Sequence, residues 1–450
     1  MSVRRFVLLL VCIAAAASVS AREISQASPE KLGFSVARLA KVTEFMNAEV
    51  QQGTMIGGMG LIARDGKIVY QQTYGMADRE AGRLMEEDAI FRIYSMTKPI
   101  TGVALMMLFE EGKFKLSDPV AMYLPELANL QVALSTAETG STSNGIVTRS
   151  HGQTDESLIG QTRQPARQPT IRDLMLHTAG FTYGVFGDTE VDRLYNQLSA
   201  KGDMSLEQYV IELGKLPLQY EPGAKWHYSI SVDIQGRLIE VLSGMKFSDF
   251  LQQRIFAPLD MADTSFVVPV EKRPRLAQLY QPKGNVGADF LAMTRSAELE
   301  VASPWISAGY FGMNEFESGG AGLVSTMRDY LRFTHLLLNE GELDGVRILA
   351  PKTVQLMTAN HVAHLPVPYG THGYGYGLGF GIHVDPGALG IIGSPGEYSW
   401  GGAAGTRFWV DPVEGVIGIF MSQTLPNRMR LADHFKVLTY AAMTESRVSP

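Results

Sequence analysis

Hydrophobic residues near the N-terminal end of the chain follow first a helical and then a strand period. Apolar side chains recur every three or four positions over residues 35–50, which predicts an amphipathic helix. Two apolar runs, 60–64 and 67–70, flank Asp65-Gly66. An Asp-Gly pair between two β-forming runs is typical of a tight turn, so we expect a hairpin here.

The C-terminal part has the same kinds of pattern. Bulky side chains alternate with glycine over 374–382, which predicts a strand with one bulky and one bare face. Residues 406–410 and 416–421 predict another hairpin, and residues 431–442 predict a closing helix. We therefore expect strands from both chain ends to share one antiparallel sheet with helices on its faces.

The middle of the chain has mostly helical periodicity. The expected fold class is α/β of the α+β type: a sheet lobe from about 35–95 and 366–445, and a mostly helical lobe from about 96–365. Residues 135–169 are polar and rich in Ser, Thr, Gly and Gln, which predicts a long exposed loop.

The first 21 residues have the composition of a secretory signal. Arg4-Arg5 precede an apolar run that ends in small residues at Ala21. Cleavage there would leave 22–450, exported to the periplasm or secreted, which is long enough for one large two-lobed domain or two smaller ones. Cys12, the single cysteine, lies in the signal, so the mature chain would have no disulfide or thiol chemistry. No later apolar run could span a membrane, so stable membrane insertion is not expected.

Charge and motifs exclude several function classes. The net charge is −7 with no basic run, which argues against a nucleic-acid partner. No serine has glycine at both −2 and +2, and the glycines of 373–381 do not complete a dinucleotide motif. His361 and His364 have half of a metal-site spacing without a Glu between them, and loop histidines explain them better. We expect neither a metal nor another cofactor.

The pattern Ser-x-x-Lys occurs three times, at Ser28 to Lys31, Ser95 to Lys98 and Ser243 to Lys246. The spacing alone most simply indicates a capping serine followed by a surface lysine. The first and third copies fit that interpretation, because one precedes a proline at a helix start and the other lies at a helix end.

The surroundings of Ser95 favour chemistry. Pro99 lies just inside a predicted helix with an apolar face over 100–108, and Gly112 ends it. Ser95 would then lie at the mouth of a buried helix, where free N–H groups favour negative charge. Lys98 lies one turn on, where a dry environment and the helix dipole should lower its pKa until the amine can act as a base.

Two further segments complete the candidate chemistry. Tyr228 lies in EPGAKWHYSIS (221–231), ahead of a helical run at 234–242. A phenol near a buried lysine can take the proton of a serine, although a packing aromatic is the simpler alternative. The glycines of SWGGAAGTRFWVDP (399–412) would let a strand pass close to a substrate and offer backbone N–H groups.

These motifs resemble the serine β-lactamase and penicillin-binding-protein superfamily, in the class C-like branch that contains the family VIII carboxylesterases. Other segments resemble family landmarks in the expected order, at 74–78, 116–120, 123–126, 171–180 and 319–326. The resemblance extends from about residue 35 to 445 and implies a β-lactamase/transpeptidase-like fold.

The resemblance also implies roles. Ser95 would be the acylated nucleophile, and Tyr228 the general base that later protonates the leaving group. Lys98 would keep the serine–tyrosine pair in its reactive protonation state. The backbone N–H groups of Ser95 and Ala403 would form the oxyanion hole. Neither His177 nor His227 would be the base.

Two departures from the class C pattern affect substrate binding. Tyr-x-Asn is replaced by Tyr-Ser-Ile, ending at Ile230, and Lys-Thr-Gly by Trp400-Gly401-Gly402. These four positions would contact the substrate and form an apolar, open slot. A substrate anchored by its carboxylate would lose a charge-assisted contact of about 1.5–3 kcal/mol, whereas a neutral ester would lose nothing. Trp-Gly-Gly is itself typical of the family VIII esterases.

The implied function is a serine carboxylesterase for short-chain esters that forms an acyl-enzyme on Ser95, with weak hydrolysis of β-lactams, chiefly cephalosporins. The alternatives are a class C-like β-lactamase or a DD-peptidase. An alternative of another class is a penicillin-binding sensor that is acylated without turnover.

Overall fold

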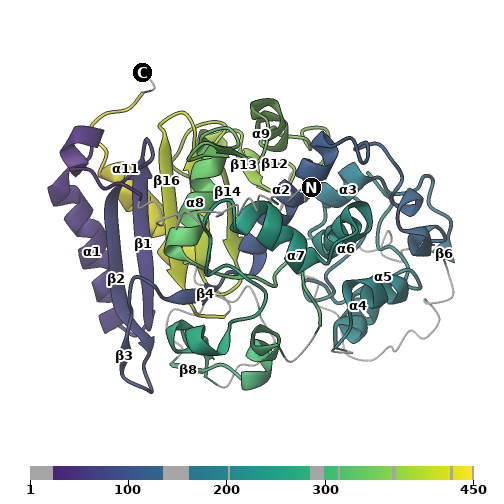
Figure 1. Ribbon diagram of the computed structural model, residues 1–450, viewed down its shortest axis with the longest axis horizontal. Helices are drawn as coiled ribbons and strands as arrows, with labels where there is room; N and C mark the ends of the chain where they lie inside the picture. The colour runs from purple at the N-terminus through teal and green to yellow at the C-terminus, as the bar shows by residue number, and fades with distance from the viewer. Residues whose placement is uncertain are drawn as a thin grey trace, which may run out of the picture.

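The computed structural model describes residues 24–134, 162–200, 203–283, 298–312, 315–366, 371–425 and 429–447 (Figure 1). The expected signal segment 1–21, with Cys12, and residues 135–161 of the expected exposed loop lie outside this range. Export and signal cleavage stay predictions. Within the described parts, no helix combines the length and the apolar content that crossing a bilayer requires.

An eight-stranded antiparallel sheet joins the two ends of the chain (Figure 1). In spatial order its strands are β12 (Tyr374–Tyr376), β13 (Gly381–His383), β14 (Tyr398–Gly402), β15 (Thr406–Asp411), β16 (Val416–Ser422), β1 (Gly57–Arg64), β2 (Lys67–Asp78) and β3 (Arg83–Leu84). β1 pairs with both β2 and β16, so an N-terminal strand is the neighbour of a C-terminal one. The expected shared sheet and both expected hairpins are confirmed.

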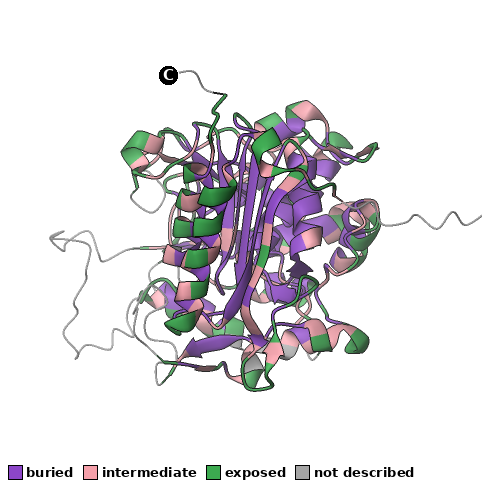
Figure 2. Cartoon of the chain, turned by 90° about the vertical axis from the view of Figure 1, so that its left-hand side faces the viewer, coloured by how far each residue is buried: buried purple, intermediate pink, exposed green. Residues whose placement is uncertain are grey.

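Helices cover both faces of the sheet, and Figure 2 shows the strands buried between them. On one face α1 (Val36–Gln51) and α11 (Met429–Ala441) pack together, and α1 buries the helically spaced Leu39, Val42 and Met46. Phe435 of α11 lies 5.8 Å, between ring centroids, from Trp409 of β15. The other face packs on α2 (Thr97–Glu110) and α8 (Met327–Leu338).

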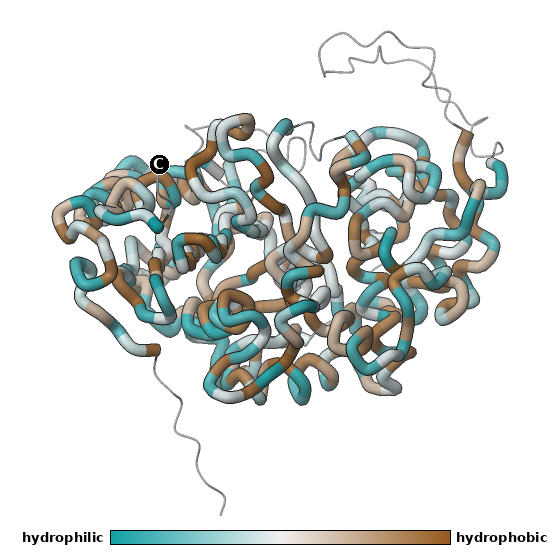
Figure 3. Tube along the Cα trace, turned by 90° about the horizontal axis from the view of Figure 1, so that it is seen from above, coloured by the Kyte–Doolittle hydropathy of each residue, from teal (hydrophilic) through white to brown (hydrophobic). Residues whose placement is uncertain are grey.

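The remaining elements form the second lobe and the connections. The other helices are α3 (Ile171–Met175), α4 (Glu190–Ala200), α5 (Leu206–Leu213), α6 (Ser231–Ser243), α7 (Phe247–Leu251), α9 (Pro351–Met357) and α10 (Pro386–Leu389), and α10 connects β13 to β14 of the sheet. Four small ladders pair β4 (Ile90–Arg92) with β9 (Val324–Thr326), β5 (Val132–Ala133) with β6 (Thr162–Arg163), β7 (Tyr280–Pro282) with β8 (Leu299–Val301), and β10 (Glu342–Leu343) with β11 (Val346–Arg347). Seen from above, the two lobes lie side by side along the long axis, and hydrophobic and hydrophilic residues are interspersed along the chain in both (Figure 3).

The structure differs from the sequence expectations at two places. Residues 374–382 are not one strand, because the chain reverses between β12 and β13, where Gly379 has φ +103°. A left-handed backbone of this kind is available to glycine and strained for other residues. The expected helical lobe at 96–365 includes α8, yet α8 packs on the sheet, with Tyr330 5.2 Å from Phe408 between ring centroids.

A buried ionic cluster fastens α11 to the sheet at the residue that precedes β14. The Glu397 carboxylate pairs with the Lys436 ammonium, and it accepts a hydrogen bond of 2.9 Å from the Tyr440 hydroxyl. Burial raises the pKa of Glu397 to about 7, against the effect of the ammonium, and burial lowers the pKa of Lys436. Each charge in this cluster is therefore tolerable only because the other is present.

Removing one partner should cost far more than removing both. Glu397→Leu leaves the Lys436 ammonium buried and unpaired, so we expect the free energy of unfolding to fall by about 3–5 kcal/mol. Glu397→Leu/Lys436→Met removes both charges and should recover most of that loss. Urea denaturation at pH 8 measures both, and a single variant that is as stable as the double variant contradicts the pairing.

Candidate active site

Ser95 lies in a 3₁₀ turn, Tyr94–Met96, directly before α2. Tyr94 has φ +42°, a left-handed conformation that is strained for a tyrosine. The hydroxyl of Tyr330 on α8 donates a 2.9 Å hydrogen bond to the Met96 carbonyl and so supports this turn. Ser95 is half-buried whereas Lys98, one turn on, is completely buried. The lysines of the other two Ser-x-x-Lys copies are exposed, so the surroundings separate the copies as expected.

The buried Lys98 ammonium donates to three oxygens from three segments. Its Nζ lies 2.7 Å from the Gly320 carbonyl, 2.8 Å from the Tyr183 hydroxyl and 3.2 Å from Ser95 Oγ. Burial lowers the pKa of Lys98 to about 7, and the negative charge of Asp233 acts in the opposite direction. At neutral pH the amine can therefore lose its proton while it stays bonded to the serine.

Tyr228 lies just before α6 and its hydroxyl donates a 2.9 Å hydrogen bond to Ser95 Oγ. Burial raises the pKa of Tyr228, while the Ser95 hydroxyl and the Trp400 indole oppose that shift. Lys98 Nζ lies 4.7 Å from the centroid of the Tyr228 ring. An amine beside a phenol has the same number of protons as an ammonium beside a phenolate, so the pair titrates as a unit. Ser95, Lys98 and Tyr228, chosen from sequence, thus lie together.

Close approach of β14 to the serine turn depends on Gly402. A Cβ at this position would lie 2.3 Å from the Ile93 carbonyl oxygen, so a larger residue would force the two segments apart. Ala403 follows in the turn between β14 and β15 and is half-buried, like Ser95. The oxyanion hole expected from the backbone N–H groups of Ser95 and Ala403 stays a prediction.

The residues expected to contact the substrate do not form the open slot that the sequence predicted. Trp400 is buried, and its ring centroid lies 5.6 Å from that of Tyr228 and 5.3 Å from that of Tyr376. Ile230, at the N-cap position of α6, is also buried within the main hydrophobic core. Of the four positions expected to contact the substrate, Gly401 is half-exposed and the other three are buried. The indole therefore packs against the Tyr228 ring, and substrate contacts for Trp400, Gly401, Gly402 and Ile230 stay predictions.

Two residues of this site were missed from sequence. The Tyr183 hydroxyl accepts a hydrogen bond from Lys98, and Asp233 of α6 is a buried carboxylate whose charge acts on Lys98. Asp233 Oδ1 accepts hydrogen bonds of 2.6 Å from Ser318 Oγ and 3.0 Å from the Gly320 N–H, and so orients the carbonyl that receives the ammonium. An acidic residue beside the apolar positions of 231–243 was the available signal for Asp233. Tyr183 had none beyond an aromatic-rich segment.

The histidines have other contacts. His177 Nδ1 accepts a 3.2 Å hydrogen bond from the Ser229 N–H, and burial lowers its pKa well below the usual value. His227 Nε2 lies 3.2 Å from Thr182 Oγ1, and burial lowers its pKa to about 4. His361 Nε2 lies 2.7 Å from the Leu356 carbonyl. That neither His177 nor His227 is the base stays a prediction, and their contacts are compatible with it.

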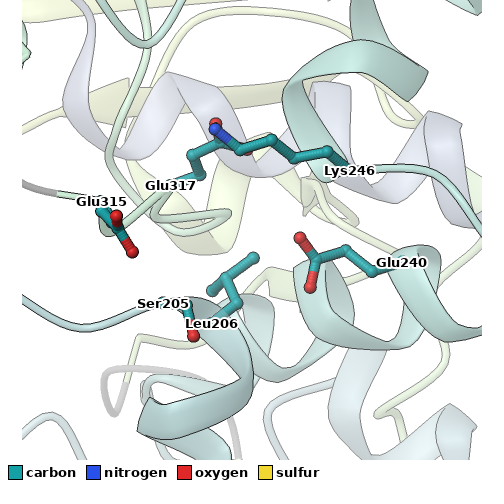
Figure 4. Close-up of a pocket in the computed structure, with 6 residues that line it drawn as sticks. All are labelled: Ser205, Leu206, Glu240, Lys246, Glu315 and Glu317. Atoms are coloured by element: carbon teal, nitrogen blue, oxygen red, sulfur yellow. The ribbon is translucent and has the colours of Figure 1, made fainter.

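A cavity of about 210 Å³ lies away from these residues, at the far end of α6 from Tyr228 (Figure 4). It is lined by Ser205, Leu206, Glu240, Lys246, Glu315 and Glu317. Three of its charged side chains are already paired, since Lys246 Nζ lies 2.6 Å from Glu317 and Glu240 lies 3.1 Å from Arg237. Among the residues that the structure describes, no three His, Cys, Asp or Glu side chains form a group that could hold a metal.

Comparison with known proteins identifies the family. The model of the Beta-lactamase family matches residues 41–442. The chain belongs to the Beta-lactamase family. It is 30% identical to Protein Rv1367c of Mycobacterium tuberculosis over 386 residues, which cover 83% of this chain and 87% of that protein. It is 28% identical to Esterase EstB of Burkholderia gladioli over 394 residues, covering 86% and 90%.

Solved structures of this family have the same fold. EstCE1, described as a hydrolase with promiscuous acyltransferase activity, superposes with a TM-score of 0.71 at 25% identity and covers 90% of this chain and 100% of its own. The β-lactamase/transpeptidase-like fold expected from sequence is confirmed, and EstB and EstCE1 support the family VIII esterase branch.

The charge of Asp233 should set the pH at which the site becomes active. Asp233→Asn keeps a side-chain oxygen for Ser318 and Gly320 but removes the charge that raises the pKa of Lys98. The Lys98–Tyr228 pair should then lose its proton more readily. We expect the rising limb of kcat/KM against pH to move to lower pH.

The measurement is kcat/KM for a p-nitrophenyl ester between pH 5 and 10, with the rate of spontaneous hydrolysis at each pH subtracted. Asp329→Asn, which changes another buried carboxylate, is the matched control and should leave the limb in place. A limb that moves to higher pH in Asp233→Asn contradicts the proposed electrostatic role.

Proposed function

We propose that this chain hydrolyses short-chain carboxylic esters through an acyl-enzyme on Ser95. As a member of the Beta-lactamase family with esterase relatives, it is a serine hydrolase. The observation that carries the proposal is the convergence on Ser95 Oγ of the Tyr228 hydroxyl at 2.9 Å and Lys98 Nζ at 3.2 Å. A nucleophile with two proton-carrying groups in reach, one of them with a pKa near 7, is suited to acyl transfer.

The proposed reaction has two halves. When the Lys98–Tyr228 pair has lost one proton, it can exist as the Lys98 ammonium beside the Tyr228 phenolate. Ser95 Oγ attacks the ester carbonyl carbon while its proton passes to this phenolate, and the backbone N–H groups of Ser95 and Ala403 stabilise the oxyanion. Tyr228 then returns the proton to the leaving alcohol, and the acyl group stays on Ser95. Water attacks the acyl-enzyme with Tyr228 as base, and release of the acid restores Ser95.

Esters are favoured over carboxylate-anchored substrates because Trp400 stands where class C enzymes carry a lysine. The buried indole adds an apolar wall beside the base and no cation. A small neutral ester needs no such cation, whereas a β-lactam or a D-Ala-D-Ala peptide would lose a charge-assisted contact. The relatives named as esterases support this choice.

Substitutions at the three central residues test the proposed function. Ser95→Ala should abolish ester hydrolysis, and Tyr228→Phe and Lys98→Ala should each lower kcat/KM by about 10³-fold or more, because each removes proton transfer. The measurement is steady-state turnover of p-nitrophenyl esters with C2 to C6 acyl groups, with folding checked by circular dichroism.

Four outcomes would overturn this proposal. A single burst equal to the enzyme concentration, without turnover, would indicate a penicillin-binding sensor. Preference for a D-Ala-D-Ala peptide would indicate a DD-peptidase, and preference for nitrocefin a β-lactamase. Full activity of Ser95→Ala would place the nucleophile elsewhere.

Weak β-lactam hydrolysis belongs to the same proposal, since the nucleophile, base and oxyanion donors serve a lactam as well as an ester. Cephalosporins, which carry a leaving group, should react faster than penicillins. Trp400→Lys would restore the lysine of the class C pattern and should raise the ratio of cephalosporin to ester kcat/KM by about tenfold, the worth of one charge-assisted contact. Trp400→Met is the matched uncharged control, and equal ratios in both variants would contradict the anchoring argument.

A further inference from the structure

A loop next to Tyr228 is held in a fixed shape by one buried carboxylate. Asp192 accepts hydrogen bonds of 2.6 Å from Thr182 Oγ1 and 2.7 Å from Thr189 Oγ1, so it ties together both ends of the segment 182–189. Asn196 adds a 2.9 Å hydrogen bond from its side-chain N–H to the Gly184 carbonyl. A Cβ at Gly187 would lie 2.2 Å from the Asp192 carboxylate, so the loop closes tightly on its clamp.

This clamped loop presents an exposed aromatic ring beside the base. Phe186, at its tip, is 42% exposed, an unusual state for a phenylalanine. Its ring centroid nevertheless lies 5.8 Å from that of Tyr228 and 5.6 Å from that of Tyr183, which bonds to Lys98. Val185, next to it, is exposed as well. An apolar surface is thus fixed at the catalytic phenol and left open to solvent.

The position of the base determines which part of a substrate reaches this surface. Tyr228 must come within hydrogen-bonding distance of the leaving oxygen in order to protonate it, so the alcohol part of an ester lies on the Tyr228 side of Ser95. The acyl part stays on Ser95 when the alcohol has left. A ring that flanks Tyr228 therefore meets the alcohol and not the acyl group.

We propose that Phe186 is a specificity-determining residue for the alcohol of the ester, and that the enzyme favours esters of alcohols with an aromatic or bulky apolar group. The inference rests on the proposed esterase function with Tyr228 as the acid for the leaving group. Stacking of the alcohol on Phe186 covers the exposed ring. The clamp through Asp192 keeps the ring in place before the substrate arrives, so little ordering cost is incurred on binding.

The test compares two acetates whose leaving alcohols have similar acidity, 2-phenylethyl acetate and ethyl acetate. Phe186→Ala should lower the ratio of kcat/KM for the first to kcat/KM for the second by about tenfold, which is what one lost aromatic contact with its buried area is worth. Phe186→Leu keeps an apolar side chain and should lower the ratio by less. Val267→Ala, at a residue equally exposed at 42% but outside the site, should leave the ratio as in the wild type.

A second comparison separates the alcohol from the acyl group. The ratio of kcat/KM for ethyl hexanoate to that for ethyl acetate should be the same in wild type and Phe186→Ala, because only the acyl part differs. A phenylethyl-to-ethyl ratio that does not change in Phe186→Ala overturns the inference while Ser95-dependent hydrolysis still supports the esterase. A changed acyl ratio instead would place Phe186 on the acyl side and overturn it too. Loss of Ser95 dependence would overturn the proposed function itself.

Discussion

The burial of the Lys98 side chain is the constraint on which the rest of the site depends. A cation removed from water needs oxygens around it, and here they come from Ser95, Tyr183 and the Gly320 carbonyl. Within the described chain no carboxylate forms an ion pair with Lys98, so desolvation is only partly compensated and its pKa falls to about 7. Three segments therefore have to converge on Lys98 Nζ: the turn before α2, the 182–189 loop and the turn at 318–320. That convergence places the serine hydroxyl within reach of a base.

The three central residues could be predicted because their signals are local, whereas their partners could not. Ser95 and Lys98 share one helical turn, and Tyr228 lies in a short segment whose residue types resemble the family. Tyr183 reaches Lys98 across 85 residues of sequence, and Asp233 reaches the Gly320 N–H across 87. Neither has a fixed spacing to the motif it serves, because tertiary packing of α6 and of a loop sets these contacts. The sequence alone does not say which side chains are buried next to Lys98.

The same distinction explains the errors in the fold. Alternation over 374–382 predicted strand conformation correctly but predicted one strand where the structure has two. The alternating glycines gave no sign that Gly379 would adopt a φ of +103° and reverse the chain. The helical pattern of 327–338 was real, but a helix pattern does not say which sheet or lobe its apolar face meets. α8 packs on β16 and also bonds through Tyr330 to the serine turn, so one helix joins the sheet to the site.

Packing of aromatic rings around Tyr228 adds to its hydrogen bond with Ser95 and its contact with Lys98. Ring centroids of His177, Tyr183, Trp400 and Phe186 lie 4.9, 5.1, 5.6 and 5.8 Å from its own, and they come from three segments, since Tyr183 and Phe186 share the 182–189 loop. Contacts between rings hold the phenol in position, and ionic strength hardly changes such contacts. The neighbouring Lys98 charge is buried too deeply for dissolved ions to screen it strongly. A lysine in place of Trp400 would exchange one of these rings for a mobile cation. The same packed rings hold the Tyr228 phenol next to Ser95 and supply apolar surface there, and the proposed preference for neutral esters depends on this surface.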